Sequence, residues 1–136
     1  MVVADGARPC FGGASFDRVL IDAPCSGLGA LRRRADARWR IQSSDVADLA
    51  ALQASNIDSC APLVRPGGFL IYSVCTVLAA ESIDHPTPDG FEVVGRIVEG
   101  LPVLDERWQE FEQGFRVLPH QHDTDGMVVI RYRRRP

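Results

Sequence analysis

The chain of 136 residues lacks lysine entirely, so arginine supplies all 15 of its basic side chains. The 18 acidic residues outnumber them, and the net charge of −3 argues against a protein that binds nucleic acid through a uniformly basic surface. Positive charge is instead concentrated locally, in the arginine-rich segments 32–40 and 131–135. Composition leaves two interpretations open for these segments, a solvated surface or a site for anions.

Long apolar runs are also absent. No segment approaches the roughly 18 uninterrupted apolar residues that a membrane span needs, and the first residues, MVVADGARP, do not have the layout of a signal peptide. We therefore expect a cytoplasmic protein with no membrane partner. The remaining composition, 46% hydrophobic and 24% charged, is typical of a single globular domain.

Candidates for metal ligands are few. The four cysteines include no CxxC pair and have no histidine at the spacing of a zinc site, which predicts free thiols and no metal. The three histidines occur in loops rich in proline, aspartate and glutamine, where we expect them to be solvated. These residues are Cys10, Cys25, Cys60, Cys75, His85, His120 and His122.

The clearest pattern is a pair of apolar runs that each end in a cysteine. The first, VLIDAPCSG at 19–27, contains Asp22 and Cys25, and the second, GGFLIYSVCT at 67–76, contains Cys75. Near-continuous apolar runs predict parallel strands that are buried on both faces. Ligands bind outside the carboxyl ends of such strands, so neighbouring strands would place the three side chains in one crevice. A plain turn followed by a small buried cysteine is an equal alternative on these grounds.

A helix is predicted between the two runs. Apolar residues recur at intervals of three and four from 44 to 63, and Ser44 and Asp45 supply capping side chains at its start. Strand, helix and strand in this order predict a right-handed βαβ unit in an α/β fold.

Less regular elements complete the prediction. Residues 2–4 are typical of the end of a strand, and 91–98 and 127–132 predict two further strands. Segment 81–91 carries two prolines and a glycine, which leaves little room for a helix. Segment 101–114 is acidic and aromatic and fits no single element.

Three segments in order carry a family resemblance. FDRVLIDAPCSGLGALRRRADARW, followed by a helix and then by RPGGFLIYSVCT and Glu81, resembles the RNA 5-methylcytosine methyltransferases of the Nop2/Sun/Fmu (RsmB-like) family. FRVLPHQHDTDGMVVIRY is similar to that family's carboxyl end. The resemblance implies a Rossmann-like class I methyltransferase sheet and an enzyme that methylates RNA. Its expected substrate is 16S ribosomal RNA, and its expected cofactor is S-adenosyl-L-methionine.

Catalytic and cofactor residues follow from the same resemblance. Cys75 matches the cysteine that adds to carbon 6 of cytosine, a covalent step that activates carbon 5 for methylation. Cys25 matches the cysteine that assists product release. Asp22 is expected to contact both the cofactor and the cytosine edge, and Asp5 is expected at the adenine amino group of the cofactor.

RNA contacts are also implied by the resemblance. Arg32, Arg33 and Arg34 are expected beside the target base or its phosphates, because a guanidinium group pairs with phosphate and stacks on bases. Trp39 has two interpretations, a stacking platform for unpaired RNA or a core residue at the head of the helix, and we expect the core.

The sequence departs from the family in having no glycine-rich strand-to-helix loop to hold the ribose and methionine of the cofactor. We therefore interpret residues 1–136 as the carboxyl-terminal portion of a single catalytic domain, with an incomplete sheet that lacks the first strands and this loop. The isolated chain is expected to be inactive. Strand 16–21 would have an unpaired edge, which we expect to be covered by a second copy in a homodimer, by strand exchange or by rearrangement of the remaining elements.

Two other functions fit the residues less closely. A DNA cytosine-C5 methyltransferase-like enzyme would use Cys25, the cysteine that follows proline, as its nucleophile. A non-catalytic RNA-binding or assembly module would keep the fold without the cofactor site.

Overall fold

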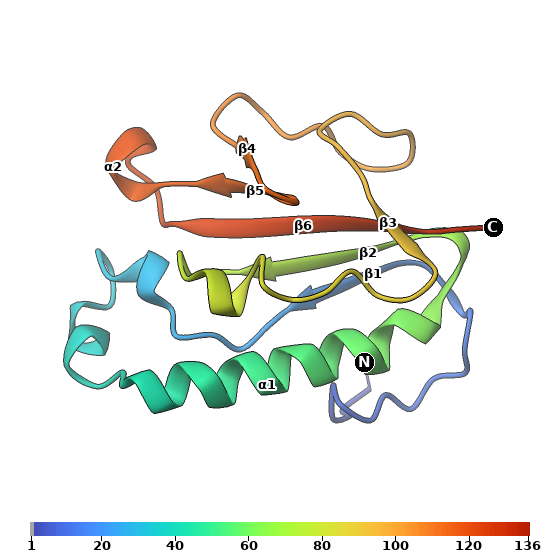
Figure 1. The fold of residues 1–136 in the computed structure, drawn as a ribbon, viewed down its shortest axis with the longest axis horizontal. Coiled ribbons are helices and arrows are strands. Elements are labelled where there is room, and N and C mark those ends of the chain that lie inside the picture. The colour runs from blue at the N-terminus through green and yellow to red at the C-terminus, as the bar shows by residue number, and fades with distance from the viewer. Residues whose placement is uncertain (1) are drawn as a thin grey trace.

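The computed structural model describes residues 2–136, in which six strands form one mixed sheet and a long helix packs against it (Figure 1). The order is β1-β2-β6-β5-β4, and β3 pairs with the part of β6 that β5 leaves free. β1 and β2 are parallel, whereas β6 is antiparallel to β2, β3 and β5. The predicted α/β class is confirmed. The strands are β1 Phe16–Asp22, β2 Val64–Val74, β3 Phe91–Val93, β4 Gln109–Phe111, β5 Gly114–Val117 and β6 Met127–Arg134.

Helix α1, Ser43–Cys60, joins β1 to β2 and confirms the predicted βαβ unit. It begins where the Asp45 carboxylate accepts a hydrogen bond from the backbone nitrogen of Gln42 at 2.9 Å, which stabilises the first turn. Within residues 2–136, no helix has the length and apolar character needed to cross a membrane. The short helices are η1 Leu28–Ala30, η2 Ala35–Trp39, η3 Ala61–Leu63, η4 Ala79–Glu81 and α2 Pro119–His122.

The main core lies between α1 and one face of the sheet. Leu70, Tyr72 and Ile130 are completely buried there, and Ile57 of α1 belongs to the same cluster. Side chains alternate between the two faces of a strand, so the neighbouring residues of β2 and β6 point to the opposite face.

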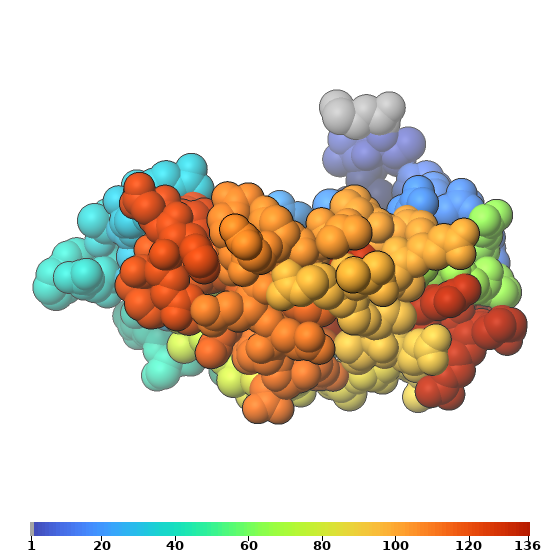
Figure 2. Space-filling view, turned by 90° about the horizontal axis from the view of Figure 1, so that it is seen from above, coloured from blue at the N-terminus to red at the C-terminus, as the bar shows by residue number. Residues whose placement is uncertain are grey.

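The chain between β3 and β4 covers part of this opposite face. The Arg131 guanidinium donates a hydrogen bond to the carbonyl oxygen of Arg96 at 3.1 Å, and Nε of Arg18 donates one to the carbonyl oxygen of Gly100 at 2.8 Å. Figure 2, seen from above, shows the segment in gold and orange across the face turned to the viewer. Long side chains from β1 and β6 therefore hold an otherwise irregular segment against the sheet.

The edge strand β1 differs from its prediction. It was expected to be buried on both faces, but Leu20 is 66% exposed, because β1 has only β2 as a neighbour within residues 2–136. Residues 2–4 form no strand, since no neighbouring strand is available to pair with them. The first residues, dark blue in Figure 2, protrude from the body of the molecule.

Two further predictions are wrong for reasons of tertiary contact. The strand expected at 91–98 ends at Val93, because β5 pairs with the rest of that edge of β6. Trp39 was expected in the core but is 84% exposed. It ends η2, whose buried residue is Ala37.

Candidate active site

Two half-buried thiols meet at the carboxyl ends of β1 and β2. The parallel pairing continues one step past β1, where the Ala23 backbone nitrogen donates to the carbonyl oxygen of Ser73 at 3.0 Å. Beyond this point the two loops converge, and the sulfur atoms of Cys25 and Cys75 lie 3.5 Å apart. The structure therefore brings together the two cysteines that the sequence analysis singled out.

The environment of Cys25 disfavours its thiolate. Burial raises the pKa of Cys25 to about 12, because the thiolate would lose hydration, and the neighbouring Cys75 raises that pKa further. Cys25 is therefore a protonated thiol at neutral pH, and its S–H can point at the sulfur of Cys75. This arrangement offers a hydrogen-bond donor to any charge that forms on Cys75.

A completely buried carboxyl group joins the two cysteine loops. One oxygen of Glu81 accepts a hydrogen bond from the Ser26 backbone nitrogen at 2.7 Å. The other oxygen accepts from the Ser26 hydroxyl at 2.5 Å and from the Thr76 hydroxyl at 2.8 Å. Ser26 follows Cys25 and Thr76 follows Cys75, so Glu81 fixes the residue after each thiol.

A second layer of buried polar groups supports Glu81 from α1. The Gln53 amide donates to the carbonyl oxygen of Pro24 at 2.8 Å and to Glu81 at 3.4 Å. Its own carbonyl oxygen lies 3.0 Å from Nε2 of His85. Because that oxygen can only accept, Nε2 must carry the proton. The middle of α1 is thus tied to the Cys25 loop.

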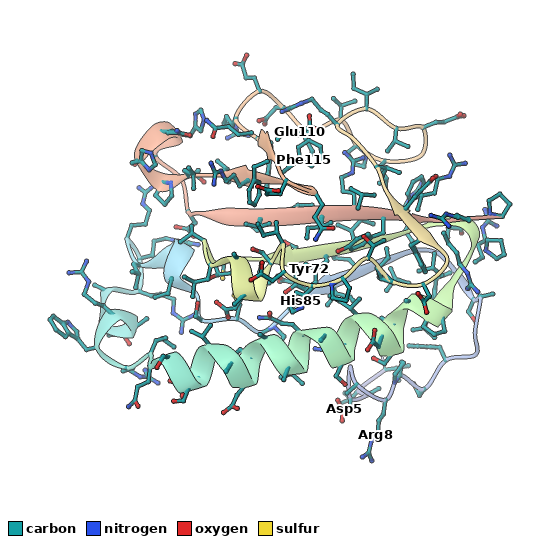
Figure 3. The ribbon with its side chains drawn as sticks, viewed as in Figure 1. Asp5, Arg8, Tyr72, His85, Glu110 and Phe115 are labelled. Atoms are coloured by element: carbon teal, nitrogen blue, oxygen red, sulfur yellow. The ribbon has the colours of Figure 1, made fainter. Side chains whose placement is uncertain are left out.

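His85 overturns its prediction as a solvated histidine. It is only 6% exposed, and its ring packs edge-on against Tyr72, with centroids 5.5 Å apart (Figure 3). Burial lowers its pKa below the usual range. The sequence gives no sign of this role, because the partners lie on a distant strand and on α1.

Close backbone packing anchors the other side of the Cys25 loop. The Gly29 backbone nitrogen donates to the carbonyl oxygen of Cys75 at 3.0 Å, and the Gly126 backbone nitrogen donates to the carbonyl oxygen of Gly29 at 2.8 Å. A side chain at Gly29 would overlap the backbone of Gly126. Glycine is therefore required where the loop before β6 meets the cysteine loops.

The predicted acidic residues line a groove whose lining includes neither Cys25 nor Cys75. Asp5 and Asp22 both line an open groove of about 420 Å³ between the free edge of β1 and α1. Leu20 and Leu52, which are both exposed, also line this groove. Asp5 also accepts a hydrogen bond from the Ala7 backbone nitrogen at 3.0 Å, in a turn on the outer side of the molecule (Figure 3).

The arginines that follow the Cys25 loop separate into two kinds. Arg32 forms an ion pair with Asp123 at 2.8 Å, and Arg33 forms one with Asp125. Arg34 has no acidic partner within residues 2–136. It lines a smaller groove of about 240 Å³ together with Cys25.

Comparisons with known proteins show which family the chain resembles in sequence. Residues 1–133 match the family model described as 16S rRNA methyltransferase RsmB/F. The chain is 45% identical over 135 residues to the ribosomal RNA small subunit methyltransferase B of Salmonella paratyphi B. This alignment covers 93% of this chain and 29% of that protein.

Solved structures share the fold. The protein PH0851 matches with a TM-score of 0.76 and 28% identity over 89% of this chain and 27% of that one. NSun6 from Pyrococcus horikoshii, solved with SFG, matches with a TM-score of 0.61 and 26% identity over 85% of this chain and 29% of that one. The chain spans 26 to 30% of the length of the curated relatives that it matches.

Proposed function

Because the chain belongs to the 16S rRNA methyltransferase RsmB/F family, we propose that it forms the carboxyl-terminal part of a catalytic domain that methylates carbon 5 of cytosine in ribosomal RNA. The observation that carries this proposal is the 3.5 Å separation of the Cys25 and Cys75 sulfurs. A covalent mechanism of this kind needs one thiol as nucleophile and a second group that manages protons beside it.

Cys75 is the nucleophile in this mechanism. After its thiol gives up a proton, the sulfur bonds to carbon 6 of cytosine, and the electron pair of the 5,6 double bond becomes available at carbon 5. Bound S-adenosyl-L-methionine would supply the methyl group to carbon 5 and would be released as S-adenosyl-L-homocysteine. A base then removes the proton from carbon 5, the double bond forms again, and the Cys75 thiolate leaves carbon 6.

Cys25 assists this last step. As a protonated thiol beside Cys75, it donates a hydrogen bond to the sulfur as negative charge returns to it. The donor stabilises the departing thiolate and speeds release of the product. Glu81 holds the two loops at the spacing that this contact requires.

The groove of Asp5 and Asp22 fits part of the cofactor. The methyl donor carries positive charge on its sulfonium and amino groups, which two carboxylates in one groove attract. The exposed faces of Leu20 and Leu52 offer apolar contact to its adenine ring. The groove is open along β1, so residues 2–136 enclose the cofactor on one side only. We accordingly propose that the isolated chain is inactive.

The mechanism is tested in a chimera, in which residues 1–133 replace the matching segment of the Salmonella relative. RNA that contains 5-fluorocytosine traps the covalent adduct, since the fluorine at carbon 5 cannot leave as a proton does. We expect Cys75→Ala to abolish the adduct on a denaturing gel, and Cys25→Ala to preserve or accumulate it. The reverse result would favour the enzyme that attacks through Cys25. A chimera that binds RNA but forms no adduct would favour the non-catalytic module.

A further inference from the structure

An exposed tryptophan lies close to the groove of Cys25. Trp39 is 84% exposed, although a side chain of this size usually buries most of its surface. The 3-10 turn η2 presents it, while Ala37 of the same turn is buried and anchors the backbone. The indole ring is therefore held outward on a fixed turn.

Arginines without an acidic partner occur close to Trp39 in the sequence, and the groove that Arg34 lines also contains Asp36 and Asp45. Segment 31–41, LRRRADARWRI, carries five arginines and one aspartate in a chain of net charge −3. Arg40 pairs with Asp36 at 3.3 Å, whereas Arg34 and Arg38 have no acidic partner within residues 2–136. The surface next to Trp39 therefore attracts an anion that the chain itself does not supply.

The same segment reaches the thiols. Arg34, Ala37 and Arg40 line the groove that also contains Cys25. Trp39 lies between two of these residues in sequence, so its backbone is adjacent to the wall of this groove.

We propose that Trp39 is a stacking platform for an unpaired base of RNA that flanks the methylated cytosine, with Arg34 and Arg38 on the adjoining phosphates. This inference rests on the proposed function and adds the form of the substrate. A base can stack on an aromatic side chain only when it has left a duplex, so the platform selects single-stranded or locally opened RNA.

Trp39 also provides the optical test, because the chain has only two tryptophans. With Trp108 replaced by phenylalanine, all the indole emission comes from Trp39. We expect a single-stranded cytidine nonamer to quench this emission, and a duplex of the same length or inorganic polyphosphate to quench it much less. Equal quenching by polyphosphate, or none by the nonamer, would overturn the proposal. So would a larger response to phosphatidylglycerol vesicles, which would indicate a membrane surface.

Substitutions separate stacking from charge. Trp39→Ala should weaken binding of the nonamer roughly 5- to 100-fold, and Trp39→Phe should weaken it less. The salt dependence of Trp39→Ala should equal that of the unmodified chain, whereas Arg38→Ala should reduce the slope of log K against log salt by about 0.7. Binding by Trp39→Ala within two-fold of the original would contradict a stacking role. Far-ultraviolet circular dichroism checks that each variant keeps its fold.

The chimera separates this inference from the proposed function. If Trp39 stacks on RNA but no adduct forms at Cys75, the platform stands and the catalytic proposal fails. If Trp39→Ala changes neither the rate of adduct formation nor the RNA concentration that it requires, the catalytic proposal stands and the platform fails.

Discussion

Replacing Glu81 with alanine should destabilise the fold severely, because this residue holds both cysteine loops from inside the core. The change removes the acceptor for the Ser26 backbone N–H, for the Ser26 and Thr76 hydroxyls and for one Gln53 hydrogen bond. An unsatisfied buried donor costs roughly 1–3 kcal/mol. The two hydroxyls lie 3.1 Å apart and can bond each other, which recovers part of the loss.

The net cost should be about 4 kcal/mol in the free energy of unfolding, once the small cavity is included. At about 2.1 cal/mol/K of unfolding entropy per residue, this corresponds to a decrease of roughly 14 °C in Tm for 136 residues. Urea denaturation followed by circular dichroism measures the first quantity, and thermal denaturation measures the second.

Glu81→Gln is the informative comparison. Its amide can donate to the Ser26 and Thr76 hydroxyls, which can rotate to accept, so the loss should be only about 1–2 kcal/mol. Glu106→Ala, at an exposed position, controls for the removal of an acidic side chain. Equal stability of Glu81→Ala and Glu81→Gln, or a loss below about 1 kcal/mol for the alanine variant, would refute the claim that these hydrogen bonds hold the loops.

Three further predictions concern the loops and the sheet edge. Gly29→Ala should lower the free energy of unfolding, measured by urea denaturation, by roughly 2–3 kcal/mol. Gly95→Ala is the control and should change it little, because a methyl group at Gly95 meets nothing within 4 Å. Equal effects of the two substitutions would argue against close packing of Gly29 on Gly126. Burial lowers the pKa of His85 in the folded state, so the unfolded state binds a proton first as the pH falls. The free energy of unfolding should therefore keep the full contribution of His85 above pH 6.5, the usual pKa of the group, and decrease below it. His85→Gln, which can still donate to Gln53, should remove part of that decrease, and an identical pH profile would exclude His85 as its source. Because β1 has a free edge and Leu20 is exposed, we expect the chain to self-associate, as sedimentation velocity would detect. Leu20→Lys should shift the population toward monomer. A monomer at every concentration of the unmodified chain would count against the homodimer.

Local sequence patterns were sufficient for the central unit of the fold. The recurrence of apolar residues from 44 to 63 predicted a helix that the structure places at Ser43–Cys60. Two apolar runs ending in cysteine predicted parallel strands, and the structure decides in favour of the interpretation in which their terminal thiols meet, because the carboxyl ends of adjacent parallel strands share one edge of a sheet.

Features that depend on distant partners could not be predicted in this way. His85 is buried through contacts with Tyr72 and Gln53, which lie 13 and 32 positions away, and nothing in its own loop sequence signals them. Trp39 has the composition of a core residue, and only the tertiary placement of η2 shows that it faces solvent. The exposure of Leu20 likewise depends on the absence of a second neighbour for β1, a property of the sheet and not of the strand.

The position of β6 has a consequence for biosynthesis. It is the last of the six strands along the chain, yet it lies between β2 and β5 in the sheet. While a ribosome is still adding residues before Met127, the emerging polypeptide exposes two sheet edges that later become interior, and contacts of such long sequence separation form slowly. Gly126, just before this strand, cannot yet donate its hydrogen bond to Gly29 in the loop of Cys25. The contact between Gly126 and the Cys25 loop can therefore form only after the residues of β6 have been added.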